Sequence, residues 1–389
     1  MSRVLIAGCG YIGTRLALRL RDLGHEVVAL RRRAFELEGI ETLAADITET
    51  SKLRLPGVDV AFFTAAPDSR DESAYRAVYV DGLREVSSSL DTGTRLIFVS
   101  STAVYGQDYG SVVDESSPTV PRNFRGRVLL EAEAMARVTL RLGGLYGPGR
   151  TRALEEVRSG RARFSSGRFL NLIHRDDACG ALEHVMSLPE PEWVYLGIDT
   201  EPVESESFYR WLAGQDGQSP PLPAAGGGNA HDLGKRCSSA LLRASGYVFE
   251  YPTYRHGYGE LMKRRIFEPC PDKANCVSST GARAKHRLVP WRFAGSAADV
   301  QRALAGALAE IGGHIVVSEA DYLRAEFSSR VFGFVDDVEL AVNAASKTID
   351  FRSAPRTGYS DLGVNRRRMR KLWRRLVDER KILAVPTFE

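Results

Sequence analysis

The first thirty residues constrain the fold of this chain more than any other stretch. An apolar run at 4–7 leads into Gly8-Cys9-Gly10-Tyr11-Ile12-Gly13, and a helical pattern over 14–23 precedes a second apolar run at 27–30. Gly8 permits a tight turn, Gly10 lets a pyrophosphate approach the backbone, and Gly13 lets the helix pack closely on the strand. Because strand, glycine turn, helix and strand follow in order, the segment predicts a dinucleotide-binding βαβ unit rather than a turn without a ligand. Its expected cofactor-binding residues are Gly8, Gly10, Tyr11, Ile12 and Gly13.

The end of the second apolar run indicates which dinucleotide fits. An acidic residue there would bind the ribose 2′-hydroxyl of NAD, whereas this chain has Arg31, Arg32 and Arg33. The guanidinium groups of Arg31 and Arg32 could hold a 2′-phosphate, so the sequence predicts NADP, with NAD as the alternative. A solvated basic loop would also explain three consecutive arginines.

Composition excludes several classes of protein. A length of 389 residues with 43% hydrophobic residues is enough for two soluble domains. The formal charge of +4 is small for this size and argues against a nucleic-acid partner. No apolar run approaches the about 18 residues that span a bilayer, so we expect a cytoplasmic protein without an integral membrane segment. Five scattered cysteines favour neither a disulfide scaffold nor a metal site.

The pattern of apolar runs changes along the chain. Strand candidates at 58–63, 95–99, 138–142 and 192–197 alternate with helical patterns such as 74–90 and 127–137. This alternation predicts an α/β fold with a Rossmann-like, doubly wound parallel sheet over residues 1–264. Residues 265–389 instead predict a smaller α+β domain with an antiparallel sheet. Its elements are a helix at 298–311, strands at 314–317, 322–328, 331–342 and 348–352, and a helix at 364–380.

Three further blocks carry a family resemblance for roughly residues 1–264. They are Val99-Ser100-Ser101-Thr102-Ala103-Val104-Tyr105-Gly106, then Arg141-Leu142-Gly143-Gly144-Leu145-Tyr146-Gly147-Pro148-Gly149, and Asn171-Leu172-Ile173-His174-Arg175-Asp176-Asp177. In order and spacing they resemble the extended short-chain dehydrogenases/reductases, which include nucleotide-sugar epimerases and dehydratases. The resemblance implies a nicotinamide cofactor and hydride transfer assisted by a Ser or Thr, a Tyr and a Lys.

The resemblance assigns a catalytic hydroxyl but not the usual acid/base pair. Ser101 matches the substrate-orienting hydroxyl, although it could instead cap the end of its strand. With Glu133 fixing the register, the family's tyrosine and lysine positions hold Arg125 and Leu129. An arginine stays protonated, so Arg125 can stabilise a substrate but is a poor general acid. The substitute acids within expected reach are Tyr105, Tyr109, Tyr146 and His174, with a structural role as the alternative for His174.

The same resemblance implies further contacts with the cofactor. Asp46 matches the acidic residue that contacts adenine, and Ala65 and Ala66 match small residues beside the pyrophosphate. Ordinary packing of a strand against a helix would also require small residues at 65 and 66.

Residues 266–385 resemble the family called domain of unknown function 1499. The resemblance rests on Asn275-Cys276-Val277-Ser278-Ser279, on 332–339 and on the block 350–368, in which Pro355 departs from the usual serine. Asp350, Arg352, Arg356, Tyr359, Asp361 and Asn365 could bind a polar ligand or form a hydrogen-bond network that ties the last helix to the sheet. We expect Cys270 and Cys276 to be free thiols, with a small-loop disulfide as the alternative. The basic last helix favours a solvated face over an anionic surface.

Three functions follow from these observations. The first is an NADPH-dependent oxidoreductase that acts on a small molecule, fused to an accessory domain. The second is a nonenzymatic NADP-binding module, and the third is a nucleotide-sugar epimerase or dehydratase with a relocated acid/base. A homodimer is an open alternative to a monomer.

Overall fold

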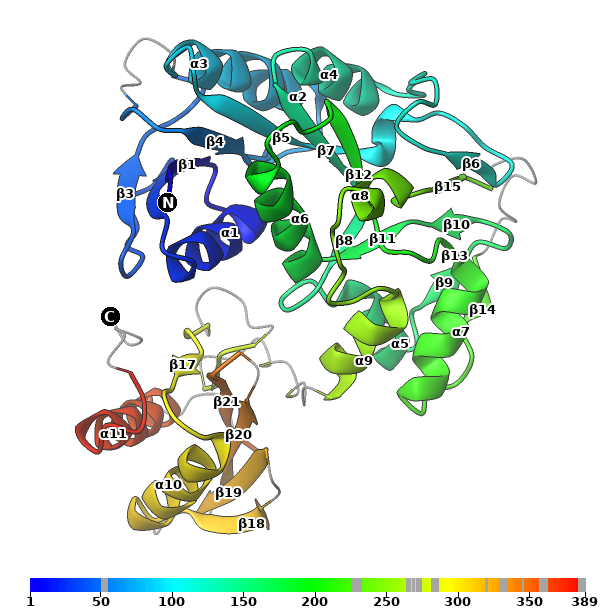
Figure 1. Ribbon diagram of the computed structural model, residues 1–389. Helices are drawn as coiled ribbons and strands as arrows, with labels where there is room; N and C mark the ends of the chain where they lie inside the picture. The colour runs from blue at the N-terminus through cyan, green and yellow to red at the C-terminus, as the bar shows by residue number, and fades with distance from the viewer. Residues whose placement is uncertain are drawn as a thin grey trace. The chain divides into compact units, whose positions relative to one another are not determined.

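The chain divides into two compact units in the computed structural model. Unit 1 comprises Met1–Leu261 and unit 2 comprises Met262–Glu389. The structure describes residues 1–49, 55–224, 233–263, 267, 270, 275–280, 287–318, 321–328, 335–344, 346–356 and 363–383. Figure 1 shows the helices and strands of the two units.

Unit 1 is built on a seven-stranded sheet. In spatial order its strands are β12 (Val194–Gly197), β7 (Val138–Leu142), β5 (Arg95–Ser101), β4 (Val60–Phe63), β1 (Arg3–Ala7), β2 (Glu26–Arg31) and β3 (Glu41–Ala44). All neighbouring strands are parallel, so the predicted Rossmann-like sheet is confirmed. The strand order reverses between β1 and β4, and ligands bind at the carboxyl ends of strands at such a switch point.

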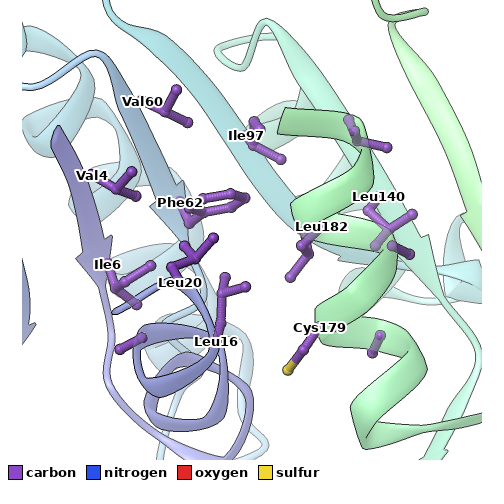
Figure 2. Close-up of a cluster of buried hydrophobic side chains, with 14 of the residues drawn as sticks. Val4, Ile6, Leu16, Leu20, Val60, Phe62, Ile97, Leu140, Cys179 and Leu182 are labelled. Carbon is purple, nitrogen blue, oxygen red and sulfur yellow. The ribbon is translucent and has the colours of Figure 1, made fainter. Parts of the chain in front are cut away.

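Both faces of this sheet are buried along its central strands β1 and β4, which are largely apolar. Val4 and Ile6 of β1 point to one face, where α1 (Tyr11–Asp22) and α6 (Arg175–Ser187) pack, as Figure 2 shows. The ion pair Arg15–Asp176, at 2.7 Å, also joins these two helices. Leu5 and Ala7 belong to the core of the opposite face. The glycine turn is thereby fixed between a sheet and two helices.

The helices of the second face differ in their bounds from the prediction. The helical pattern at 74–90 forms α2 (Glu72–Arg76), a π-helical segment η2 (Ala77–Gly82) and α3 (Leu83–Ser88). The helix expected at 127–137 is α4 (Phe124–Glu133). It begins earlier because the Asn123 side chain accepts hydrogen bonds from the backbone N–H groups of Arg125 and Gly126 at 3.1 and 3.4 Å.

Small elements follow the carboxyl ends of the central strands. The three residues that directly follow Ser101 form the 3-10 helical turn η3 (Thr102–Val104). Two short parallel pairs are β8 (Gly144–Tyr146) with β11 (Leu172–His174), and β6 (Ser111–Val113) with β15 (Lys235–Cys237). The remaining elements are α5 (Arg152–Arg158), β9 (Arg163–Phe164), β10 (Phe169–Leu170), β13 (Val203–Glu204), α7 (Ser205–Gln215), β14 (Leu222–Pro223), α8 (Ala240–Ala244) and α9 (Tyr254–Lys263).

Unit 2 contains the predicted antiparallel sheet. Strands β18 (His314–Ser318), β19 (Tyr322–Ser328), β20 (Val335–Asn343) and β21 (Thr348–Pro355) pair in sequence order. The short strands β16 (Val277–Ser278) and β17 (Trp291–Arg292) both pair with β21. The core of unit 2 includes residues of α10 (Ala297–Glu310) and α11 (Val364–Asp378). The first residues of the strand predicted at 331–342 lie outside the described part.

The polar block of unit 2 forms a hydrogen-bond network. Asn365 of α11 accepts hydrogen bonds from Ser353 and, at 2.7 Å, from Arg368, and it donates to the Asn275 carbonyl at 3.1 Å. Arg368 also pairs with Asp336 of β20 at 2.7 Å. The network therefore ties the last helix to the sheet, which was the second of the two predicted roles. Tyr359 and Asp361 lie outside the described residues.

The expectation for two cysteines of unit 2 is wrong. Cys270 and Cys276 form a disulfide, and their Cα atoms lie 5.6 Å apart. That separation is within the range that a disulfide spans. The expectation of free thiols rested on the cellular compartment and not on the geometry of this short loop. Cys9, Cys179 and Cys237 are free and buried.

No helix in the described part of the chain combines the length and the apolar character that a membrane crossing requires.

Candidate cofactor-binding and active site

The three glycines of the first turn have different surroundings. A Cβ atom on Gly8, whose φ is +103°, would lie 2.3 Å from the backbone nitrogen of Ala65. A Cβ atom on Gly13 would lie 2.3 Å from the carbonyl oxygen of Gly8. Gly8 and Gly13 are therefore required by close backbone packing at the junction of β1, β4 and α1. In contrast, a Cβ atom on Gly10 would meet no atom within 4 Å.

The open space at Gly10 lies at the N-terminus of α1. Gly10 is the N-cap residue of this helix, no side chain caps it, and its first turn contains no acidic residue. Backbone N–H groups and the positive end of the helix dipole suit an anion at this position. The turn thus fits the pyrophosphate of a dinucleotide, and a side chain at Gly10 would enter the space that the phosphates need.

Tyr11 is held between two arginines. The guanidinium carbons of Arg150 and Arg175 lie 4.4 and 5.1 Å from the centre of its ring. Both contacts are cation–π interactions. Burial raises the pKa of Tyr11 to about 12. The sequence placed Tyr11 at the cofactor turn, but its two cationic neighbours come from segments more than a hundred residues away and were not foreseen.

The arginines after β2 are exposed and have different neighbours. Arg31 lies over the ring of Phe35, with its guanidinium carbon 5.8 Å from the centre. Arg32 forms an ion pair with Asp68, which follows β4. Asp46 follows β3, and its carboxylate accepts hydrogen bonds from the backbone and the hydroxyl of Thr48 at 2.9 and 2.8 Å. These hydrogen bonds hold the pKa of Asp46 below its usual range.

The hydroxyls at the end of β5 have separate roles. Ser100 is buried and donates a hydrogen bond to Glu133 at 2.6 Å. Ser101 accepts a hydrogen bond from the backbone N–H of Ala103 at 3.2 Å and so caps η3. The alternative role predicted for Ser101, a cap at the end of its strand, is therefore present in the structure. It uses Ser101 Oγ as an acceptor and leaves its proton for a substrate oxygen.

A buried ion pair lies beside Ser100. Arg141 of β7 and Glu133 of α4 approach to 2.6 Å, with side chains that are 7% and 9% exposed. Arg141 also donates to the Tyr105 hydroxyl at 2.6 Å. Tyr105 is 2% exposed, and burial raises its pKa to about 12. Tyr105 was a candidate catalytic acid, and the structure places its hydroxyl inside this network.

The positions that replace the family's tyrosine and lysine both lie on α4. Leu129 is 4% exposed and belongs to the core beneath the sheet. The guanidinium of Arg125 lies over the rings of Tyr75 and Phe124, at 5.9 and 5.7 Å from their centres. The register expected from the motifs would thus place a permanent positive charge where the family has a phenol, and an apolar side chain where the family has an ammonium.

The other substitute acids lie in unlike environments. Tyr109 is 67% exposed, with a φ of +56°. Tyr146 is buried, stacks on Tyr258 with ring centres 4.4 Å apart, and contacts His174 edge to face. His174 accepts the backbone N–H of Asp176 at 3.2 Å and thereby caps α6, which supports its structural role. Burial raises the pKa of Tyr146 far above its usual value.

Asp199, which the sequence did not single out, lies beside this aromatic group. It follows β12, is buried, and accepts the backbone N–H of Glu201 at 3.0 Å. Burial raises its pKa to about 8. Its sequence context does not signal burial, because the polar residues Thr200 and Glu201 follow it directly.

Two family models match the chain. Residues 1–162 match the RmlD substrate binding domain, and residues 267–376 match the protein family of unknown function DUF1499. A structure from Methylobacillus flagellatus, assigned provisionally as an NAD-dependent epimerase/dehydratase, is 35% identical. The alignment covers 67% of this chain and 98% of that chain, with a TM-score of 0.57. The chain belongs to the NAD-dependent epimerase/dehydratase family.

Two other members of this structural group are more distant. A functionally unknown conserved protein from Silicibacter pomeroyi is 26% identical, with a TM-score of 0.56, and the alignment covers 68% of this chain and 99% of that chain. The human epimerase family protein SDR39U1, solved with NADPH, is 23% identical over 67% of this chain and 99% of that chain, with a TM-score of 0.57. No curated protein matches the chain. The epimerase/dehydratase resemblance that the sequence motifs carried is thus confirmed for unit 1, and the DUF1499 resemblance for unit 2.

Among the described residues, no group of three or more His, Cys, Asp or Glu side chains is placed to hold a metal ion.

Proposed function

We propose that unit 1 binds a nicotinamide dinucleotide and transfers hydride to or from a small molecule, with NADPH preferred over NADH. The observation that carries this proposal is the open space at Gly10, at the uncapped N-terminus of α1 and at the switch point of the sheet. When bound, the nicotinamide would supply the hydride. The neighbours solved with NADPH or NAD support the cofactor class.

Each cofactor contact is assigned to particular residues. The backbone at Gly8, Gly10, Tyr11, Ile12 and Gly13 would surround the pyrophosphate, with Ala65 and Ala66 beside it. Asp46 would contact the adenine. Arg31 and Arg32 would hold the 2′-phosphate, in which case Arg32 exchanges Asp68 for the phosphate.

The chain's own residues would orient the reacting substrate. Ser101 would donate a hydrogen bond to the reacting oxygen, and Arg125 would act as a fixed positive charge. Tyr105 would act through its hydrogen bond with Arg141 and not as a base. Its pKa of about 12 keeps the phenol protonated near neutral pH. Unit 2 would serve as an accessory domain, and we take the two units as separate domains.

The proposal is tested by measuring nucleotide binding to the purified full chain. Calorimetry with NADPH and NADH should give a tighter dissociation constant for NADPH. Failure of both nucleotides to bind would overturn the proposal. NADH that binds at least as tightly as NADPH would overturn the preference alone.

Two other functions predict different results in the same experiment. A nucleotide-sugar epimerase would retain NAD through purification, as expected for a cofactor that is regenerated in each cycle. Relatives of similar fold solved with UDP-glucose and NAD motivate this alternative. A nonenzymatic module would bind NADPH but would not oxidise it with any of the carbonyl compounds in a substrate panel.

We also propose a cytoplasmic location. Whether the chain forms a homodimer is to be measured in solution. The disulfide Cys270–Cys276 weighs against the location, because structural disulfides are rare in reducing compartments. Alkylation of thiols in freshly lysed cells, followed by mass spectrometry of the peptide 270–276, measures its state directly. A quantitatively oxidised pair would contradict the cytoplasmic location.

A further inference from the structure

The proposed reaction leaves one proton without a donor. Reduction of a carbonyl requires a proton for the oxygen as well as a hydride for the carbon. The family's phenol and ammonium are replaced by Arg125 and Leu129, and an arginine does not release its proton near neutral pH. Of the four substitute acids, Tyr105 and Tyr146 are buried, His174 caps α6, and Tyr109 is 67% exposed to solvent. Lys235 is a further titratable side chain, and it contacts the segment that follows Ser101.

Lys235 is unusual in the composition of this chain. The sequence contains 45 arginines and eight lysines, and residues 1–261 contain only Lys52 and Lys235. Lys52 lies outside the described residues. Among basic side chains, a lysine readily exchanges its proton when partly buried, whereas an arginine does not. Lys235 is half-buried, and its ammonium donates to the carbonyl oxygen of Tyr105 at 2.8 Å.

This hydrogen bond places Lys235 next to the segment that follows Ser101. Tyr105 comes directly after η3, the turn that Ser101 caps. The ammonium has three N–H donors, and the Tyr105 carbonyl uses one of them. The remaining donors suit an oxygen of a substrate bound beside this turn.

Asn171 fixes Lys235 at the carboxyl edge of the sheet. Its side chain donates to the carbonyl of Lys235 at 2.9 Å and accepts the N–H of Cys237 at 2.6 Å. Its own carbonyl accepts the N–H of Gly144 at 2.6 Å. Gly144 lies two residues beyond the end of β7, whose last residue, Leu142, pairs with Ser101 of β5. Lys235 and Ser101 are thus attached to adjacent strand ends.

The surroundings of Lys235 ease the loss of its proton. Burial lowers its pKa, and the nearby positive charges of Arg122 and Arg168 lower it further, whereas Cys237 and Asp108 act in the opposite direction. Asp108 is itself paired with Arg122 at 2.7 Å. The arginines also make the region around Lys235 attractive to a substrate that carries a carboxylate or phosphate.

We propose that Lys235 is a catalytic residue of unit 1, which contacts the carbonyl oxygen of an anionic substrate and supplies its proton. This inference rests on the proposed reductase function. As the carbonyl carbon accepts the hydride, a proton passes from Lys235 Nζ to the oxygen, an O–H bond forms, and an N–H bond breaks. The neutral amine then regains a proton from water. In the reverse direction the amine accepts the alcohol proton.

The first test needs no substrate and uses trace acylation of the full chain by acetic anhydride across a pH series. Only the neutral amine reacts, so mass spectrometry of each lysine gives the pH of half-maximal rate. Lys347 is the internal reference, because it also donates to a carbonyl, that of Gly295 at 2.8 Å, but is exposed. Lys235 should reach half-maximal rate at a lower pH than Lys347. An equal or higher pH, or no reaction at any pH, would overturn the proposal.

The second test separates proton donation from charge and from cofactor binding. Lys235→Arg keeps the charge and a donor for Tyr105, and Lys235→Met removes both; Lys347→Met is the control. Calorimetry should give native NADPH affinity for all three variants. If the native chain itself does not bind NADPH, the proposed function is refuted, whereas the acylation result for Lys235 still stands. With a panel of 2-oxo acids and phosphorylated ketones, both Lys235 variants should lose at least about a hundredfold in kcat. Lys235→Arg should retain the native KM. Native kcat in Lys235→Arg would show that only the charge matters and would contradict the proton transfer.

Discussion

Arg141 donates a hydrogen bond to the hydroxyl of Tyr105 at 2.6 Å, and with the same guanidinium it binds the carboxylate of Glu133. These contacts join β7, α4 and Tyr105, the residue that follows η3. A tyrosine adjacent to a strand end could have been a surface acid. Its hydroxyl instead accepts a hydrogen bond from the buried guanidinium of Arg141. The network therefore stabilises the segment that carries Ser101.

We expect the Glu133–Arg141 pair to be essential for stability. Removing one partner leaves a buried charge without compensation, so Glu133→Gln or Arg141→Met should lower the free energy of unfolding by about 3–5 kcal/mol. Urea unfolding followed by tryptophan fluorescence measures this loss. The exposed pair Arg84–Asp81 is the control, and Arg84→Met should cost less than about 1 kcal/mol. Equal losses in the free energy of unfolding at the two ion pairs would show that burial does not determine how much an ion pair contributes to stability.

The open space at Gly10 predicts a variant that loses ligand without losing its fold. In Gly10→Val the side chain would occupy the space of the pyrophosphate, and NADPH affinity should fall at least about tenfold, or 1.4 kcal/mol. Gly214→Val is the control, because a Cβ atom there also meets no atom within 4 Å, but the residue lies on α7. Calorimetry gives the affinity and thermal unfolding reports the fold. Native affinity in Gly10→Val would show that the phosphate site is elsewhere.

The arginines after β2 should determine the choice of nucleotide. Charge-assisted contacts with a 2′-phosphate contribute about 1.5–3 kcal/mol, so NADPH should bind more than about tenfold tighter than NADH. The double variant Arg31→Ala, Arg32→Ala should bind both nucleotides alike. Asp68→Asn should strengthen NADPH binding, because Arg32 no longer has a competing carboxylate. An unchanged preference in the double variant would assign the phosphate to other residues.

The chemistry of the site should depend on a hydroxyl and not on a tyrosinate. Once a substrate is found, Ser101→Ala should lower turnover on the order of a hundredfold, since it removes one preorganised donor. Restoring the family's pair with Arg125→Tyr and Leu129→Lys should not raise turnover, because Leu129 is a core position and the site is not shaped for that pair. Steady-state kinetics check both statements, and a gain in the double variant would contradict the second.

Asp199 should make stability depend on pH. Its pKa is about 8 in the folded chain, compared with an ordinary value of 3.8. The folded state therefore binds one more proton than the unfolded state between these values, and this contribution to stability is lost as the pH rises through about 8. In Asp199→Asn the decline of Tm between pH 5 and pH 8 should flatten. Asp22→Asn, at an exposed carboxylate, is the control and should leave the decline unchanged.

The sequence predicts most of the fold because the apolar periodicity is strong. Strand β19 occupies the residues expected for it, and the glycine turn leads into α1 as its motif requires. The start of α4 was misplaced because its cap, Asn123, lies outside the apolar pattern. Lys235 and Asn171 were not foreseen as neighbours of the Ser101 turn, since only the completed sheet brings these distant segments together.

The contact between α1 and α6 has a consequence for synthesis of the chain. Arg15 and Asp176 are separated by 161 positions, and their helices cover the same face of the sheet. A nascent chain that has not yet reached α6 exposes part of this apolar face, including the residues opposite Leu182 (Figure 2). Long-range contacts of this kind slow folding and leave partly made chains prone to aggregate. Helix α1, which directly follows the nucleotide turn, is therefore fully packed only after residues 175–187 have been translated.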